Sequence, residues 1–252
     1  MFNVELITEK TIPALMLNPM LIGEYGKFQA DKARDGVIDR LLGVSPSTGL
    51  SESIRSVVLC LVDADPKTVS HKPGFWSKFT GSADAGRVRF EVAKGSIETL
   101  LANATKEADR VRTIVASIDG LIQQLLEETV FIELHVQAAH QFMASGGRGE
   151  DATRQAANGY ELETVKERFS RRVLSLQALN LSFSQTIEQL RLLKHQLIDV
   201  LDRFDETSQV LLPLWRQSML ALGLQQHATG EQLHRAIHAH ETLRKSLASI
   251  KQ

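Results

Sequence analysis

A stripe of apolar residues, repeated at alternating steps of four and three, is the feature that most constrains how this chain folds. Counted in this way from Ile97 to Met143, thirteen of fourteen positions are apolar, and Thr129 is the exception. A repeat of 3.5 residues keeps one stripe of a helix against one partner, as in a coiled coil. No proline interrupts this region, so we expect one very long helix from about residue 86.

A second stripe of the same kind runs from Phe169 to Trp215. Eleven of its fourteen positions are apolar, and the exceptions are Asn180, Lys194 and Ser208. Two matched stripes separated by the glycine-rich residues 145–149 predict an antiparallel hairpin. We interpret Asn180 and Lys194 as polar residues that set the register of the pairing, with a wet interface beside the N-terminal helices as the alternative.

The first 80 residues are divided by many Gly and Pro turn signals, so only short elements fit there. One helix is expected over residues 28–42, with Val37, Ile38, Leu41 and Leu42 on a common face. Another is expected over residues 51–63, with Ser51 as its N-cap and a strand as the competing interpretation. Residues 66–85 are expected to form a loop.

Beyond the second stripe, Pro213 is expected to kink or end the helix near Leu212. A last helix is expected over residues 231–250, docked on the bundle by Leu233, Ile237, Leu243, Leu247 and Ile250. The resulting fold class is all-α, an elongated antiparallel helical hairpin or coiled-coil bundle of two very long helices. We assign short N-terminal helices and a linker to residues 1–85, and the hairpin with its C-terminal helix to residues 86–252.

Composition limits the function classes further. Aromatic residues make up 6% of the chain, and 29 Lys and Arg balance 30 Asp and Glu, so no overall field favours nucleic acid. Cys60 is the single cysteine, which excludes an internal disulfide and a thiolate metal cluster. The N-terminus lacks a secretory pattern and no apolar run spans a bilayer, so we expect a cytoplasmic protein.

Three segments of the chain are distinctive. Residues 211–217 read Leu-Leu-Pro-Leu-Trp-Arg-Gln, residues 221–224 read Ala-Leu-Gly-Leu, and residues 73–79 read Pro-Gly-Phe-Trp-Ser-Lys-Phe. They resemble segments of the toxic-anion (tellurite) resistance family, the TelA-like proteins: the first two are similar to that family's Pro-Leu-Trp and Ala-Leu-Gly-Leu region, and the third to its linker ahead of its long helix. The order of the parts agrees as well, and the resemblance covers roughly residues 25–225.

The resemblance implies a bacterial protein linked to resistance to tellurite and to envelope or toxic-compound stress, with no established enzyme activity and no cofactor. Only motif positions carry over, with unknown roles: Phe75, Trp76, Phe79, Pro213, Leu214, Trp215 and Gly223. The sequence contains no phosphate loop, His-Glu-x-x-His motif or nucleophile elbow. We therefore expect a non-enzymatic protein that binds protein partners along its coiled-coil surface, with self-association left open.

A metal- or oxyanion-binding protein that uses the histidine-rich last helix is one alternative function, and a membrane-associated scaffold is another. His234 and His238 are four residues apart on the last helix, with Glu241 three residues further, so two imidazoles and a carboxylate could hold a divalent metal. The competing interpretation is a solvated face, because Lys245 continues it. His240 lies within the apolar stripe and is expected to be a packed, hydrogen-bonded interface histidine.

Two further surfaces have a functional and a structural interpretation. Tellurite is an oxyanion, and the arginines that could capture it are Arg110, Arg112, Arg168, Arg171 and Arg172. Neighbouring acidic residues favour ordinary surface ion pairs there. The aromatic cluster of Phe75, Trp76 and Phe79 beside Lys78 fits a peripheral membrane or partner anchor, or simply a linker pinned to the bundle.

Overall fold

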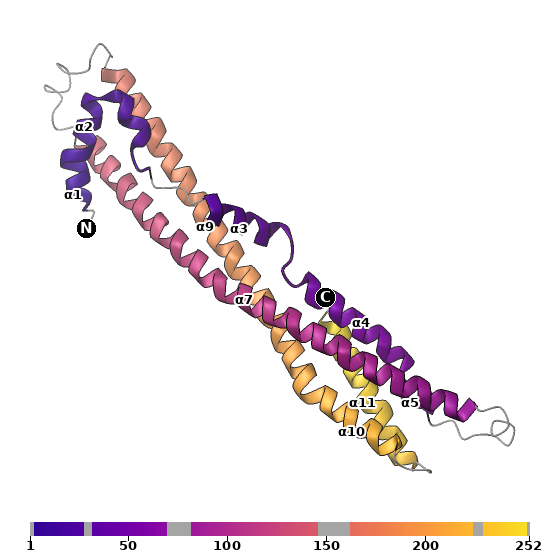
Figure 1. Ribbon diagram of the computed structural model, residues 1–252. Coiled ribbons are helices and arrows are strands. Elements are labelled where there is room, and N and C mark those ends of the chain that lie inside the picture. Colours follow the sequence, from indigo (N-terminus) through magenta and orange to yellow (C-terminus); the bar gives the residue numbers. More distant parts are fainter. Residues whose placement is uncertain (1–2, 28–31, 70–81, 146–161, 224–228, 251–252) are drawn as a thin grey trace. The chain divides into compact units, whose positions relative to one another are not determined.

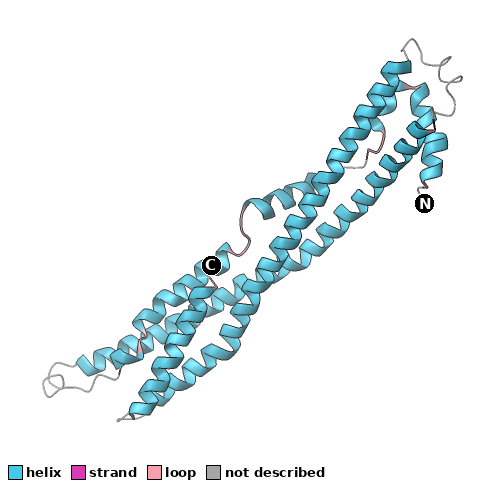
Figure 2. Ribbon diagram, turned by 180° about the vertical axis from the view of Figure 1, so that it is seen from behind, coloured by secondary structure: helices cyan, strands magenta, loops and turns pink. Residues whose placement is uncertain are grey.

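The computed structural model describes residues 3–27, 32–69, 82–145, 162–223 and 229–250. Within these ranges every regular element is helical, which confirms the predicted all-α class (Figures 1 and 2). In chain order the elements are α1 (Val4–Leu6), the π-helical η1 (Ile7–Thr11), α2 (Ile12–Leu17), the 3-10 helix η2 (Pro19–Glu24), α3 (Lys32–Gly43), α4 (Thr48–Asp63), α5 (Pro66–Val69), α7 (Ser82–Ala144), α9 (Leu162–Glu206), the π-helical η3 (Thr207–Leu211), α10 (Leu212–Gly223) and α11 (Gly230–Ser249).

The chain divides into two compact units. Unit 1 comprises Met1–Leu42 and Ile118–Leu192, and unit 2 comprises Gly43–Ser117 and Leu193–Gln252. The helices α7 and α9 therefore each contribute one part to unit 1 and another to unit 2. The predicted boundary between residues 85 and 86 follows the change in sequence pattern, whereas the contacts divide the chain across both long helices.

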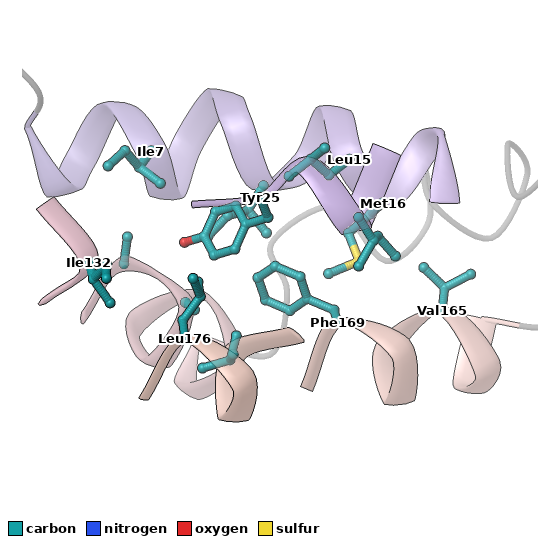
Figure 3. Close-up of a cluster of buried hydrophobic side chains, with 13 residues drawn as sticks. Ile7, Leu15, Met16, Tyr25, Ile132, Val165, Phe169 and Leu176 are labelled. Carbon is teal, nitrogen blue, oxygen red and sulfur yellow. The ribbon is translucent and has the colours of Figure 1, made fainter. Parts of the chain in front are cut away.

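In unit 1 the two long helices run antiparallel, because Asn180 of α9 contacts Glu133 of α7 while Ser170 contacts Met143. The N-terminal segment packs on this pair and closes a core (Figure 3). The core residues labelled there are Ile7, Leu15, Met16, Tyr25, Ile132, Val165, Phe169 and Leu176. Each fully buried aliphatic or aromatic side chain stabilises such a core by about 1.5–3 kcal/mol. The predicted stripes supply most of its α7 and α9 sides, and Ala138 and Val165, which lie outside the stripes, supply the rest.

A single left-handed residue lets the N-terminal segment approach α9. Gly26 has a φ of 61°, and a Cβ atom there would lie 2.6 Å from Leu176 Cδ1. Tyr25, next to it, is buried and donates a hydrogen bond from its hydroxyl to the carbonyl of His135 at 2.6 Å. The Tyr25 carbonyl accepts a hydrogen bond from Arg172 Nε at 2.8 Å. Tyr25 thus joins α7 and α9, a role that the sequence pattern did not indicate.

The buried face of α3 differs from the prediction. Val37 is 40% exposed and Leu42 is 39% exposed, so these two residues lie outside the buried face. Ile38 is buried, Leu41 is half-buried, and the face begins with Arg34, which is 5% exposed. The guanidinium of Arg34 pairs with Glu128 of α7 and with Asp35. The buried face of α3, which follows steps of four and three, therefore begins with the charged residue Arg34, whose ion-pair partner Glu128 lies in the same unit.

Unit 2 contains α4, α5, η3, α10 and α11 together with the first part of α7 and the last part of α9. Its α4 confirms the helix over the strand alternative, but the helix begins at Thr48, so the predicted N-cap at Ser51 is wrong. The Ser51 amide instead donates to Ser47 O at 2.9 Å, inside the first turn. Of the predicted loop over residues 66–85, α5 and the start of α7 are helical, and residues 70–81 lie outside the described part.

The last helix docks as predicted. α11 contacts α10, η3, α4 and α5 in unit 2. Leu243, Leu247 and Ile250 are buried, and Leu233 and Ile237 are half-buried. Thr229 begins the helix with a capping box, in which its hydroxyl accepts from the Gln232 amide while the Gln232 side chain accepts from the Thr229 amide. Such reciprocal caps satisfy two amides that a helix N-terminus leaves free.

Candidate functional site

The Pro-Leu-Trp segment begins α10, directly after a widened helical turn. The amide of Leu212 bonds to Thr207 O, five residues earlier, so the ladder takes a π-type step just before Pro213. Proline lacks an amide hydrogen and its ring clashes with the preceding turn of an α-helix. The π turn accommodates both problems, and the chain continues as α10 to Gly223. The predicted break near Leu212 is therefore a change of helical type.

A π turn followed by a proline is also found in the N-terminal segment. η1 is a five-residue π turn, the Ile12 amide bonds to Ile7 O, and Pro13 is the second residue of α2. The first residue of each π turn is buried, Ile7 at 2% and Thr207 at 1% exposure. A π turn inserts an extra residue and rotates the following side chains about the helix axis. Each proline thus follows a turn across which the step between successive buried residues widens to five, from Ile7 to Ile12 and from Thr207 to Leu212.

Trp215 lies in the core of unit 2, as its position in the predicted stripe indicates, and meets His240 of α11 there. Trp215 is 1% exposed and His240 is 3% exposed. The indole Nε1–H donates to His240 Nδ1 at 3.3 Å. This confirms the predicted hydrogen-bonded interface histidine and identifies its partner, since a buried indole N–H is costly without an acceptor.

The hydrogen bond also fixes the state of the imidazole. Because Nδ1 accepts, the single proton of the neutral ring lies on Nε2. Burial lowers the pKa of His240, and the nearby charge of Asp65 opposes that shift, as does that of Glu241, whereas Arg244 and Lys67 add to it. The net direction is downward, so His240 is neutral at pH 7 and remains an acceptor for Trp215.

A further contact, between η3 and α11, supports the same arrangement. The Thr207 hydroxyl donates to Arg203 O at 2.7 Å, and Thr207 Oγ1 lies 2.7 Å from Ser246 Oγ. A hydroxyl has one hydrogen to donate, so Ser246 is the donor to Thr207. The π turn is thereby tied to α11 six residues after His240. Thr207 lies one position from the stripe residue Ser208, and no signal in the sequence marked it as a buried contact.

The motif residues beside Trp215 point away from this core. Leu214 is 51% exposed, Val210 is 51% exposed, and Pro213 is also exposed. Gly223 ends α10. The structure therefore brings Trp215 and His240 together and leaves Leu214 on the surface. The remaining motif residues Phe75, Trp76 and Phe79 lie outside the described residues.

The candidate metal ligands do not gather. His234, His238 and Glu241 are all exposed on α11, and Glu241 pairs with Lys67 of α5 at 3.4 Å. Among the residues that the structure describes, no three His, Cys, Asp or Glu side chains are placed to hold a metal ion. The geometry favours the solvated-face interpretation of this histidine pair.

Three of the five candidate oxyanion ligands, Arg110, Arg112 and Arg172, are engaged with the protein itself, whereas Arg168 is half-buried and Arg171 is exposed on α9. Arg110 pairs with Glu107 at 2.6 Å, and Arg112 bridges Asp109 at 2.7 Å and Asp205 at 2.5 Å. Arg172 donates to the Tyr25 carbonyl. Asn180, the predicted register residue, donates to Glu133 at 3.3 Å while its Oδ1 is buried without a hydrogen bond.

One shallow groove lies between α7 and α9 in unit 1. Its volume is about 540 Å³, and its polar lining includes Glu133, His140, Gln177 and Asn180. Gln177 Nε2 lies 3.0 Å from His140 Nε2, so these two side chains form a hydrogen bond with each other.

None of the helices in the described ranges combines the length and apolar character that a membrane span needs.

Comparison with known proteins identifies the family of this chain. A family model described as "Toxic anion resistance protein (TelA)" matches residues 15–243, which include Pro213, Trp215 and His240. The chain is also 30% identical to "Protein KlaA" of Escherichia coli over 246 residues, which cover 98% of this chain and 95% of that protein. No solved structure matches the chain. The chain belongs to the toxic anion resistance (TelA) family.

Proposed function

We propose that this protein acts in the cytoplasm, without enzyme activity, and confers resistance to toxic anions by binding a protein partner through the exposed part of its Pro-Leu-Trp segment. Membership of the TelA family supports the role in resistance. The observation that supports partner binding is the opposite placement of two neighbours, since Trp215 is 1% exposed and Leu214 is 51% exposed. The side chain of Trp215 packs in the core, whereas packing within the chain does not require a leucine at the exposed position 214.

The surface around Leu214 suits a protein contact. Val210, four residues earlier, is equally exposed, so the two apolar side chains share one face across the junction of η3 and α10. Apolar side chains at an interface contribute by leaving water, and a charge introduced among them opposes binding. The contacts of Trp215 and Thr207 with α11 hold this face in place from behind.

A complementation experiment tests the proposal. Cells lacking the gene receive the wild-type chain, Leu214→Glu or the matched control Leu59→Glu, which changes a 61% exposed leucine of α4. We expect Leu214→Glu to lose tellurite resistance at normal protein level and helicity, while Leu59→Glu retains it. Full resistance with Leu214→Glu would refute the partner surface. Unchanged sensitivity on deletion of the gene would refute the role in resistance.

Direct capture of the anion is the alternative that calorimetry decides. Titration of tellurite into the purified chain is expected to release no binding heat, because Arg110, Arg112 and Arg172 already have partners in the protein. Saturable binding of tellurite would contradict a mechanism that acts through a protein partner alone.

A further inference from the structure

The part of α9 in unit 1 contains an unusually long uncharged segment. Residues 173–187 include no Asp, Glu, Lys or Arg, in a chain of which 23% is charged. A solvent-exposed helix usually carries charges on its outer face. The absence of charge here extends to the residues that point away from the core, so the packing of unit 1 alone does not account for it.

Two stripes follow this segment on different faces. The inner stripe is buried against α7 and the N-terminal segment and includes Val173, Leu176 and Ile187. The outer stripe takes the same alternating steps of three and four, and all its members are exposed: Arg171, Leu174, Ala178, Leu181, Gln185 and Glu188. Leu174 is 63% exposed and Leu181 is 61% exposed. A second 3.5-residue stripe on the outer face is typical of a helix that meets another helix there.

The charges at the two ends identify the partner. Arg171 stands at one end of the outer stripe and Glu188 at the other, and the midpoint lies between Leu179 and Asn180. A second copy of α9, laid antiparallel about that midpoint, places Arg171 of each copy opposite Glu188 of the other. The same symmetry places Leu174 opposite Gln185, and Ala178 opposite Leu181. In an antiparallel coiled coil each a position of one helix lies opposite a d position of the other, and these three pairs follow that rule.

Other arrangements fit the stripe less well. A parallel pair would place Arg171 against Arg171 and Glu188 against Glu188, and like charges across an interface oppose association. A membrane-surface helix carries Lys and Arg beside its apolar face, whereas this segment has no cation between residues 173 and 187. A self-complementary patch is the mark of a two-fold symmetric interface.

We propose that two copies of this chain form an antiparallel homodimer through the outer stripe of α9, centred between Leu179 and Asn180 and closed at both ends by Arg171–Glu188 ion pairs. This surface belongs to unit 1 and is separate from Leu214, so the proposal does not rest on the proposed function. Within one copy Glu188 already pairs with Arg191, three residues on, at 2.5 Å, so Arg171 of the other copy would share this carboxylate. Each ion pair is exposed and contributes mainly to orientation, while the leucines supply the apolar contact.

Sedimentation of the full chain tests the dimer. Wild-type protein is expected to show a mass near twice that of the 28.0 kDa chain, and the dissociation constant of Leu181→Glu is expected to rise at least about tenfold. The control Leu59→Glu, with an equally exposed leucine on α4, should sediment like the wild type. A wild-type chain that remains monomeric at all concentrations would overturn the proposal.

A charge exchange tests the orientation without touching the apolar residues. Arg171→Glu alone places two carboxylates together at each end, and Glu188→Arg alone places two guanidinium groups together, so each variant should dimerise weakly. When the two variants are mixed, every end again has one charge of each sign, and a heterodimer should form with nearly wild-type affinity. If the two variants still dimerised weakly when mixed, the result would contradict the antiparallel arrangement.

Cysteine cross-linking in a Cys60→Ser background provides an independent readout. Leu174→Cys mixed with Gln185→Cys should form a disulfide-linked heterodimer under mild oxidation, because these positions oppose each other. Leu174→Cys alone should cross-link poorly. Efficient cross-linking of Leu174→Cys to itself would indicate a parallel pair and overturn the proposal, whatever the sedimentation result.

Discussion

The indole Nε1–H of Trp215 donates a hydrogen bond to Nδ1 of His240 across 3.3 Å, and both rings are almost completely buried between α10 and α11. The bond requires an imidazole that is neutral and protonated on Nε2. A motif residue of the TelA family is thereby joined to a histidine outside the segment that resembles the family motif. Protonation of His240 on Nδ1 would remove the acceptor that Trp215 uses in unit 2.

The contribution of this pair can be measured with a double-mutant cycle. Trp215→Phe keeps most of the ring volume but leaves His240 Nδ1 without a donor, and we expect it to lower the free energy of unfolding by about 1–3 kcal/mol. Trp215→Ala also creates a cavity and should cost about 3–5 kcal/mol. Urea denaturation followed by circular dichroism provides the measurement. If His240→Phe and Trp215→Phe proved fully additive, the hydrogen bond would contribute nothing.

Stability should fall as the pH drops below about 6.5, the pKa of a histidine in an unfolded chain. Burial lowers the pKa of His240, and it also lowers that of His135, whose Nδ1–H donates to Phe131 O at 2.8 Å. Below pH 6.5 the unfolded state therefore binds more protons than the folded state, so the stability present above this pH is lost toward the lower folded pKa values. Urea denaturation at pH 7.5 and 5.5 measures the loss.

Histidine variants distinguish the contribution of the buried histidines to this pH dependence from that of other titrating groups. Replacement of both His135 and His240 with Gln should reduce the difference in stability between the two pH values. The control replaces the exposed His234 and His238 with Gln and should keep the wild-type pH dependence. An unchanged difference in the first variant would show that other groups govern the acid response.

The ion pair of Arg34 and Glu128 should be costly to break from one side. The Arg34 side chain is 4% exposed and that of Glu128 is 18% exposed, so removing one partner leaves a nearly buried charge. We expect Arg34→Met to destabilise unit 1 by about 3–5 kcal/mol, and Arg34→Met with Glu128→Leu to recover much of this. Hydrogen exchange of amides in α3 and in residues 118–144 measures the effect. A double variant no more stable than Arg34→Met would contradict the argument.

Two glycines of unit 1 should respond to alanine in opposite directions. At Gly26, alanine must adopt a left-handed conformation and its Cβ would press on Leu176, so we expect a loss of about 1–3 kcal/mol. At Gly120, inside α7, a Cβ would meet no atom within 4 Å, and alanine should stabilise the helix by about 0.5–1 kcal/mol. Thermal or urea unfolding measures both. Equal effects at the two sites would refute the conformational argument at Gly26.

Local periodicity by itself determined the long helices. The stripes from Ile97 and from Phe169 are buried at most positions, and their polar members Asn180, Lys194 and Ser208 are half-buried. Such a pattern is readable because residues three and four apart share a helix face whatever the helix touches. The placement of His240 in an apolar stripe was readable for the same reason.

Only the tertiary structure decided which face meets which element. It selected Arg34 over Val37 for the buried face of α3, because Glu128 of a distant helix supplies the compensating charge. It placed Tyr25 on His135 and Trp215 on His240, contacts that join residues far apart in the chain. Periodicity states which residues stand together on a helix, whereas burial depends on the partner across the interface, and that partner is not encoded in the local pattern.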